Sequence, residues 1–280
     1  MGVRLSEKFG ICQGRLTTPP NNELQWFPGA KWPIEFFQGS ELGYSFIELL
    51  AERAHNEKNP LWTKSEREKI IKISREANIG IYSACLDYII DHSFYSESNL
   101  DIEIINYSKS FINSCEHIGI KLVVLPFLEE SSLTNDNTNL VIKYLEIIGE
   151  YANKKGIEIA LESIARPEII IQVLQNIEGL KIGVVFDTGN RVLISDNLPD
   201  EIKKLSKFIN HVHLKDRDIN NKNVIVGTGI VDFVAVFQAL KDIYYNGRYS
   251  FESNRGNNVI NTAKHNLDYI RFIFGEVFDS

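Results

Sequence analysis

The sequence predicts an α/β protein folded as a single (β/α)8 TIM barrel, and three observations lead to that prediction. Eight short apolar segments recur at fairly even intervals along the 280 residues. Segments with helical periodicity lie between them, which favours parallel strands joined by right-handed crossovers. Eight such units in about 250 residues match the usual size of this barrel. A doubly wound open sheet is the alternative, but the first predicted strand lacks the glycine-rich turn of the dinucleotide-binding form.

Each predicted strand is a short run rich in Ile, Val, Phe or Tyr, as the buried strands of a parallel sheet are. The eight runs are residues 9–12, 46–49, 81–85, 122–126, 157–161, 183–186, 211–214 and 249–252. The sequence shows no linker, low-complexity segment or short repeat between them. We therefore expect one domain that spans residues 1–280.

The intervening segments predict helices at residues 65–80, 100–119, 139–156, 231–243 and 261–275. In the first helix, Ser65 and Glu68 have the spacing of a capping box, and Gly80 is expected just beyond its end. Asp232 is the expected N-cap of the fourth helix. Residues 15–37 combine prolines with tryptophans and phenylalanines and predict a long irregular segment. Such a segment is either an aromatic flap over the barrel mouth or a loop packed on neighbouring helices.

Composition and charge exclude several classes of protein. The chain is 44% hydrophobic and 24% charged, with a net charge of -7, so it can build a core but lacks the basic character of most DNA-binding proteins. It contains no apolar run long enough for a signal peptide or a membrane helix. Three widely spaced cysteines without a CxxC pair are typical of a reducing compartment. We expect a cytoplasmic protein with neither nucleic-acid nor membrane partners.

Polar residues of metal-ligand type follow four consecutive predicted strands, at the end of the barrel where active sites lie. They are Glu162, Asp187, His213 and Glu252. Side chains alternate along a strand, so each should share its inward face with the residue two positions earlier. Those inward partners are Ala160, Val185, His211 and Ser250. The residues between them and beside them are apolar, as positions facing the helices should be.

Three carboxylates and an imidazole crowded together would repel one another if all the acids were ionised without a cation. A divalent metal ion removes that repulsion. Oxygen-rich ligands with one histidine suit Mn²⁺, Mg²⁺ or Co²⁺, and Zn²⁺ also accepts such a set. The sequence therefore predicts one divalent metal ion as cofactor.

Eight motifs occur in a characteristic order between residues 9 and 255. They are GICQGRL, LGYSFIEL, LPF, IEIALES, VVFDTGN, HVHLKD, VGTGIVDF and FES. Together they resemble the sugar phosphate isomerase/epimerase superfamily, the xylose isomerase-like TIM barrels. The resemblance implies that Glu162, Asp187, His213 and Glu252 bind one divalent metal ion. It further implies that Glu162 and Glu252 act as the acid/base pair on opposite faces of a substrate carbon.

The resemblance implies a metal-dependent isomerase or epimerase of a sugar or sugar phosphate. Such an enzyme abstracts an α-proton and forms a cis-enediolate that the metal stabilises. The alternatives are a metal-dependent dehydratase or lyase of a keto-inositol or keto-acid, an apurinic-site endonuclease, and a non-catalytic binding protein. The endonucleases of the superfamily need further histidines. Here Asn190 replaces a frequent histidine, and no histidine lies between Lys215 and Gly227. A homo-oligomer is common among relatives.

Several polar residues near the strand ends are predicted to contact substrate. They are Gln13, Arg15, Glu48, Asp87, Asn190, Lys215 and Arg255. Arg15 is the strongest candidate for an anionic group, because its planar guanidinium matches a carboxylate or phosphate.

Some neighbouring residues have plainer interpretations. His211 is expected to be a hydrogen-bonded interior residue, and Asp216 a partner that holds Lys215. The glycines of residues 226–233 predict either a phosphate-binding nest or a simple turn. Cys12 and Cys85 are expected to be small buried residues that fill the interior.

Overall fold

The computed structural model describes residues 8–20, 25–96 and 99–278 of the chain. Its eight main strands form a closed barrel in the order β1-β12-β9-β8-β7-β6-β3-β2. Their bounds are β1 Phe9–Cys12, β2 Phe46–Ala51, β3 Gly80–Leu86, β6 Leu122–Phe127, β7 Glu158–Ser163, β8 Ile182–Asp187, β9 Ile209–Leu214 and β12 Arg248–Phe251. All eight predicted strands are confirmed, and their ends lie within two residues of the predicted ones. The TIM-barrel class is therefore confirmed.

Helices follow most strands, as the alternating pattern predicts. The α-helices are α1 Trp32–Leu42, α2 Lys64–Ala77, α3 Tyr88–Asp91, α4 Ile102–Ile118, α5 Thr138–Asn153, α6 Pro167–Asn176, α7 Thr188–Arg191, α8 Leu198–Leu205, α9 Phe233–Asp242 and α10 Val259–Phe278. Among the described residues, the 3-10 helices are η2 Gly29–Lys31, η3 Glu129–Ser131 and η4 Ser206–Phe208. Two small antiparallel pairs join β4 Tyr95–Ser96 to β5 Asn99–Leu100, and β10 Asp216–Arg217 to β11 Asn223–Val224. No helix in the described part of the chain is long and apolar enough to cross a membrane.

Two predictions about helix ends are wrong for local reasons. Helix α2 begins at Lys64, so Ser65 lies inside its first turn and not at the N-cap. It ends at Ala77, and Asn78 takes the left-handed conformation that was expected of a glycine (φ 53°). Gly80 is instead the first residue of β3. The prediction for Asp232 is confirmed, because its side chain accepts a hydrogen bond from the Ala235 amide.

The prediction of a long irregular segment at residues 15–37 is wrong in its second half. Helix α1 begins at Trp32, and Pro33 occupies its first turn, where the missing N–H costs nothing. Trp32 and Phe36 are buried and pack edge-to-face at 5.7 Å. These aromatics belong to a packed helix, which favours the packed alternative over a flap for this half. Residues 21–24 of the segment lie outside the described residues.

The Cα positions group into two compact units. Unit 1 comprises Met1–Ile47, Ala77–Gly80 and Phe186–Ser280, and unit 2 comprises Glu48–Glu76 and Ile81–Val185. The divisions fall inside strands β2, β3 and β8 and at the end of helix α2, and they do not coincide with a linker. The prediction of one domain stays a prediction.

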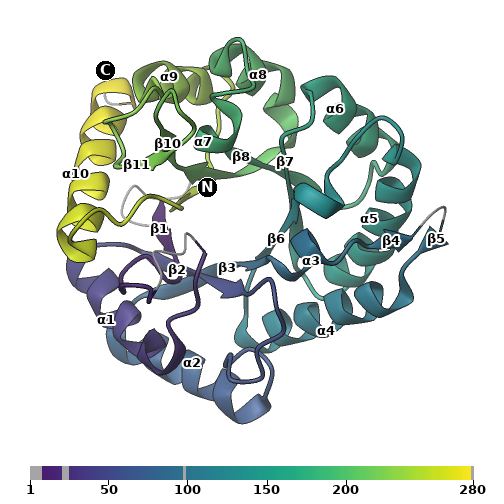
Figure 1. The fold of residues 1–280 in the computed structure, drawn as a ribbon, viewed down its shortest axis with the longest axis horizontal. Helices are drawn as coiled ribbons and strands as arrows, with labels where there is room; N and C mark the ends of the chain where they lie inside the picture. Colours follow the sequence, from purple (N-terminus) through teal and green to yellow (C-terminus); the bar gives the residue numbers. More distant parts are fainter. Residues whose placement is uncertain (1–7, 21–24, 97–98, 279–280) are drawn as a thin grey trace. The chain divides into compact units, whose positions relative to one another are not determined.

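In unit 1, strand β12 pairs in parallel with both β1 and β9. The ring centroids of Phe9 in β1 and Tyr249 in β12 lie 5.3 Å apart. Phe274 of α10 packs edge-to-face on Phe9, with 5.6 Å between the ring centroids. Phe237 of α9 and Phe274 of α10 pack near Tyr249, with ring centroids 5.5 Å and 6.1 Å from its own, and both helices lie outside the barrel strands (Figure 1). This aromatic core packs on β12, whose end carries Glu252, and β12 pairs with β9, which carries His213.

In unit 2, β6 pairs in parallel with β3 and β7, and β7 with the first part of β8. Leu50, Cys85, Leu122, Val124, Ala160 and Val185 form its buried interior cluster. Ala160 and Val185 belong to this cluster, which confirms the inward face predicted for them. By the strand period, the inward face of β7 also carries Glu162.

Candidate active site

Three of the predicted metal ligands gather at the strand ends of unit 1. Asp187 ends β8, His213 lies in β9, and Glu252 directly follows β12. His213 Nδ1 lies 3.3 Å from Glu252 Oε2 and 3.9 Å from Asp187 Oδ2. All three side chains are buried. The parallel register of β9 and β12 places them together, because Ser250 is aligned with His213 and Glu252 follows one strand period later.

Two buried cations contact the same carboxylates. Lys215 Nζ lies 3.1 Å from Asp187 Oδ2 and 2.9 Å from Glu252 Oε2. Arg15 Nη2 lies 3.3 Å from Glu252 Oε1. The repulsion between carboxylates, from which the sequence predicts a metal ion, is therefore partly relieved by the chain itself. The metal prediction now depends on the ligand geometry and not on charge alone.

The pKa values of the two acids move in opposite directions. Burial raises the pKa of Asp187, and the negative charge of Glu252 raises it further. The charges of Lys215 and His213 act to lower it but do not outweigh burial. Burial also acts to raise the pKa of Glu252, but Lys215, the His213 hydrogen bond and Arg15 hold it well below its usual range. Glu252 is consequently the more firmly ionised of the two.

Glutamine and asparagine side chains extend this charged cluster. Gln25 Nε2 donates to Glu252 Oε1 at 3.0 Å, and Gln25 Oε1 accepts from Arg15 at 2.5 Å. Asn190 Oδ1 accepts from Lys215 Nζ at 3.3 Å and from Arg217 Nη2 at 2.8 Å. Asn190 therefore holds Lys215, whereas Arg15 already binds a carboxylate and an amide of its own chain.

Two other predicted substrate contacts lie near Gly14 in unit 1. Arg255 Nε donates to the Gly14 carbonyl at 2.6 Å. Gln13, which precedes Gly14 in the sequence, is buried. Their role in substrate binding stays a prediction.

The prediction that Asp216 holds Lys215 is wrong. Its Oδ2 accepts from the amides of Gly227 at 3.0 Å and Gly229 at 2.8 Å, and its Oδ1 from Val231 at 3.1 Å and Arg217 at 2.9 Å. The backbone amides considered as a phosphate nest are therefore bound by an internal carboxylate. The turn interpretation of residues 226–233 is the correct one for these amides.

The plainer interpretation of His211 is confirmed. Its Nε2 lies 3.0 Å from Ser250 Oγ on the neighbouring strand, and the ring is fully buried. His211 and His213 lie one strand period apart with ring centroids 5.3 Å apart, so they belong to successive layers.

In unit 2, three buried carboxylates surround a thiol. Glu48 Oε2 accepts from Ser83 Oγ at 2.5 Å, and Asp87 Oδ1 accepts from Cys85 Sγ at 3.1 Å. Glu162, near the end of β7, is buried as well. Burial, followed by the charges of Asp87, Glu162 and Glu48, raises the pKa of the Cys85 thiol well above its usual value. Cys85 therefore remains a protonated, buried filler, as the sequence indicates.

Three contributors in unit 1 have no clear sequence signal. Gln25 lies in the proline-rich segment and lacks a motif. Glu35 is buried in α1 and accepts from the amides of Gly14 at 2.7 Å and Leu16 at 3.0 Å, so it fixes the turn on both sides of Arg15. Gly189 lies against the stem of Lys215. A carboxylate at an inward helix position was the one available hint for Glu35.

The donor set fits a divalent metal ion. Nitrogen and oxygen ligands about 2.0–2.2 Å from a metal lie roughly 3–3.5 Å from each other, and the 3.3 Å between His213 Nδ1 and Glu252 Oε2 is in that range. The 3.9 Å between His213 Nδ1 and Asp187 Oδ2 is somewhat longer than that range. One ligand atom from each of these three residues lies within 4.8 Å of the others.

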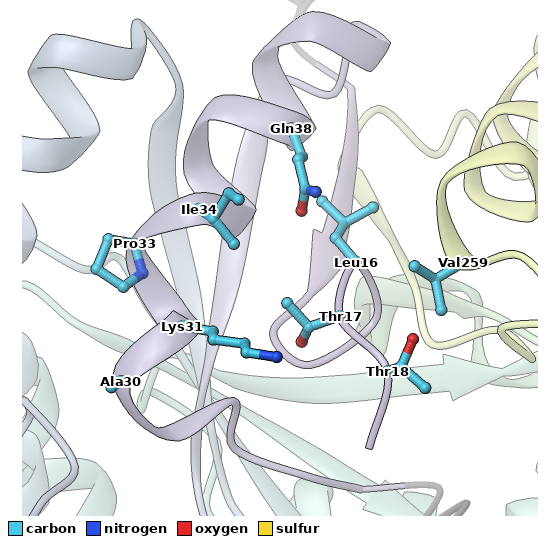
Figure 2. A pocket seen from close by; sticks show the side chains of 9 residues that line it. All are labelled: Leu16, Thr17, Thr18, Ala30, Lys31, Pro33, Ile34, Gln38 and Val259. Carbon is cyan, nitrogen blue, oxygen red and sulfur yellow. The ribbon is translucent and has the colours of Figure 1, made fainter. Parts of the chain in front are cut away.

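A separate pocket of about 600 Å³ lies in unit 1, and its lining includes Leu16, the residue that follows Arg15. It is lined by Leu16, Thr17, Thr18, Ala30, Lys31, Pro33, Ile34, Gln38 and Val259. Figure 2 shows Lys31 and Gln38 extending into it from η2 and α1. No proposed metal ligand lines this pocket, so we assign the chemistry to the charged cluster and not to this cavity.

Comparison with known proteins identifies the class. A family model described as xylose isomerase-like TIM barrel matches residues 37–273. The chain therefore belongs to the xylose isomerase-like TIM barrel family, as the sequence motifs indicate.

Individual relatives are more distant. The chain is 26% identical over 173 residues to inosose dehydratase of Geobacillus thermodenitrificans. That alignment covers 52% of this chain and 57% of the dehydratase. It is 23% identical over 240 residues to L-ribulose-5-phosphate 3-epimerase UlaE of Salmonella heidelberg. That alignment covers 80% of this chain and 82% of the epimerase. The chain matches only about half the length of several curated relatives.

Solved structures agree on the fold. The structure of an L-ribulose 3-epimerase has a TM-score of 0.78 at 16% identity, covering 96% of this chain and 95% of the other. The IOLI protein, solved with a zinc atom, has a TM-score of 0.75 at 18% identity, covering 98% and 100%. At these identities the structures establish the barrel alone. The acidic residues and histidine of unit 1 are compatible with a divalent metal ion.

Proposed function

We propose that this protein is a divalent-metal-dependent isomerase or epimerase of a sugar or sugar phosphate, and that it works by α-proton transfer. The observation that carries the proposal is the buried cluster of Asp187, His213 and Glu252 at adjoining strand ends of unit 1. The epimerases and inosose enzymes among the relatives support the same class of reaction.

Glu162 is proposed as the fourth ligand. Within unit 2 it is aligned with Val185 across the β7–β8 pair. Asp187 follows Val185 by one strand period on the same strand, so Val185 and Asp187 share a face. This register supports a common ligand set of Glu162, Asp187, His213 and Glu252.

The metal ion, when bound, would polarise the substrate carbonyl and make the neighbouring carbon acid sufficiently acidic for a carboxylate base. Glu252 would accept the proton in its ionised form, which the Arg15 guanidinium 3.3 Å from Oε1 favours. Glu162 would return a proton on the opposite face. Burial of these residues limits access of bulk water to the reacting carbon.

Neighbouring side chains would bind the substrate hydroxyls and carbonyl. We propose this role for Lys215 and Asn190 in unit 1, and for Glu48 and Asp87 in unit 2. Arg15 is better suited to orient Glu252 than to bind a free anion, because its guanidinium contacts Glu252 and Gln25. We therefore propose Arg255 or Gln13 for any polar group at the far end of the substrate.

Deuterium exchange tests the proposal directly. The protein is incubated in D₂O with Mn²⁺, Co²⁺ or Mg²⁺ and with ketoses, ketose 5-phosphates and inosose, and NMR follows incorporation at the α-carbon. We expect exchange and epimerised product with at least one substrate, and a loss of about 10³-fold or more in Glu162→Gln and Glu252→Gln. The exposed controls Glu150→Gln in unit 2 and Glu276→Gln in unit 1 should retain full activity.

The result also separates a second candidate, an inosose dehydratase, which the inosose dehydratases among the relatives favour. A dehydratase would also remove an α-proton but would then expel a β-hydroxyl as water. Product 18 mass units lighter than the substrate, formed together with exchange, would replace the epimerase proposal. Exchange that persists unchanged in Glu162→Gln and Glu252→Gln would contradict both.

A further inference from the structure

Lys215 is built into the charged cluster and does not lie at its rim. Its side chain is buried, with 3% of it exposed. Nζ lies 2.9 Å from Glu252 Oε2, 3.1 Å from Asp187 Oδ2 and 3.3 Å from Asn190 Oδ1. The ammonium group thus has three oxygen acceptors, one for each of its protons.

The surrounding backbone fixes the course of the Lys215 stem. A Cβ atom added at Gly189 would meet Lys215 Cγ at 2.5 Å and Cβ at 2.8 Å, so the stem passes where any other side chain would stand. Thr188 Oγ1 donates to the Lys215 carbonyl at 2.6 Å and lies 3.0 Å from its amide nitrogen. Residues 188–189 therefore hold Lys215 against the cluster.

Lys215 and the imidazole of His213 share the same two oxygen atoms. His213 Nδ1 lies 3.9 Å from Asp187 Oδ2 and 3.3 Å from Glu252 Oε2. The other two oxygens, Asp187 Oδ1 and Glu252 Oε1, already accept from the Asn190 amide and from Arg15 and Gln25. A metal ion held by these residues would therefore compete for the oxygens that the Lys215 ammonium contacts. A divalent ion and an ammonium group on the same oxygens repel each other strongly in a buried site.

We propose that Lys215 is an internal counter-cation that competes with the divalent metal ion for Asp187 and Glu252. The inference rests on the proposed function, because it takes the metal site from there. Metal binding would displace the ammonium from the carboxylates while Asn190 remains as an acceptor. The released ammonium would then be available to a substrate oxygen. Lys215 thereby lowers metal affinity and links metal binding to substrate binding.

Calorimetric titration of the metal-stripped full chain with Mn²⁺ measures this competition without any enzyme assay. We expect Lys215→Met to bind Mn²⁺ roughly tenfold or more tightly than the unmodified protein, because the competing charge is gone. Lys215→Gln retains a polar side chain without the charge and should show a similar gain. Lys203→Met, which removes an exposed lysine paired with Asp242, should leave the affinity unchanged.

Gly189→Ala provides an independent route, because it keeps the lysine but forces its stem aside. It should also strengthen Mn²⁺ binding. Circular dichroism selects the variants that fold, and any one folded member of the three decides the question. Equal or weaker Mn²⁺ binding in the folded variants overturns the competition, even if sugar exchange persists. Absence of Mn²⁺ binding in every form, the unmodified protein included, overturns both this inference and the metal-dependent function.

Discussion

The strand-end carboxylates of the two units have partners of different charge. In unit 1, Asp187 and Glu252 contact the cations of Lys215 and Arg15. In unit 2, Glu48 accepts from the hydroxyl of Ser83, and Asp87 from the thiol of Cys85. The local fields at Glu252 and at Cys85 therefore act in opposite ways. Cations depress the pKa of Glu252, whereas burial and three negative charges raise that of Cys85.

This difference shows how a chain can bury several acids near one another. Unit 1 uses ion pairs, which offset the cost of desolvation only while both partners are present. Unit 2 uses hydrogen bonds from neutral donors, each of which contributes less but leaves no opposite charge stranded when removed. Substitutions in the two units should consequently change the free energy of unfolding by different amounts.

The largest effect is expected for Asp187→Ala. It removes one acceptor of the buried Lys215 ammonium and the cap that accepts from the Asn190 amide at 2.7 Å. Loss of the partner of a buried ion pair costs about 3–5 kcal/mol of the free energy of unfolding, and we expect the lower end of this range because Lys215 keeps Glu252 and Asn190 as acceptors. Urea denaturation would measure it, and Asp187→Asn, which can keep the cap, should lose less. A loss below about 1 kcal/mol for Asp187→Ala would mean that the pair is not important for stability.

A smaller effect is expected in unit 2 for Ser83→Ala. The substitution removes the hydroxyl that donates to the buried Glu48 carboxylate at 2.5 Å. A hydrogen bond to a charged group contributes about 1.5–3 kcal/mol, so urea denaturation should show a loss in that range. Ser110→Ala, at an exposed position of α4, is the matched control and should change the stability little. A loss as large as that of Asp187→Ala would remove the distinction between the units.

The parts of this comparison that could be predicted are those that depend on strand periodicity. Apolar runs of four or five residues locate the strands, and the period of two separates His213 from His211. The same period assigns Ala160 and Val185 to the interior, where they lie. Local hydrophobic pattern was sufficient because buried parallel strands tolerate few other residues.

Partners that come from distant loops could not be predicted in the same way. Gln25 reaches Glu252 across 227 sequence positions and carries no motif of its own. Lys215 and Asp216 are adjacent in sequence, yet Lys215 binds the acidic cluster and Asp216 binds the amides of Gly227 and Gly229. Alternation along an extended segment turns neighbouring side chains to opposite sides, so sequence adjacency misled the pairing.

The smallest effect is expected for Arg53→Met, at the surface of unit 2. Arg53 bridges Asp91 and Glu129, but its side chain is 38% exposed, and pairs of this kind contribute about 0–1 kcal/mol. The hydrogen bond from Arg53 lowers the pKa of Asp91, so the stabilisation is present above the usual pKa of that carboxyl and disappears as the pH falls through the lowered value. Urea denaturation at neutral pH in low salt and in 1 M NaCl should show a small difference that salt largely removes. A loss above about 2 kcal/mol that resists salt would mean that exposure does not explain the contrast with Lys215, and that ion-pair geometry determines the size of both effects.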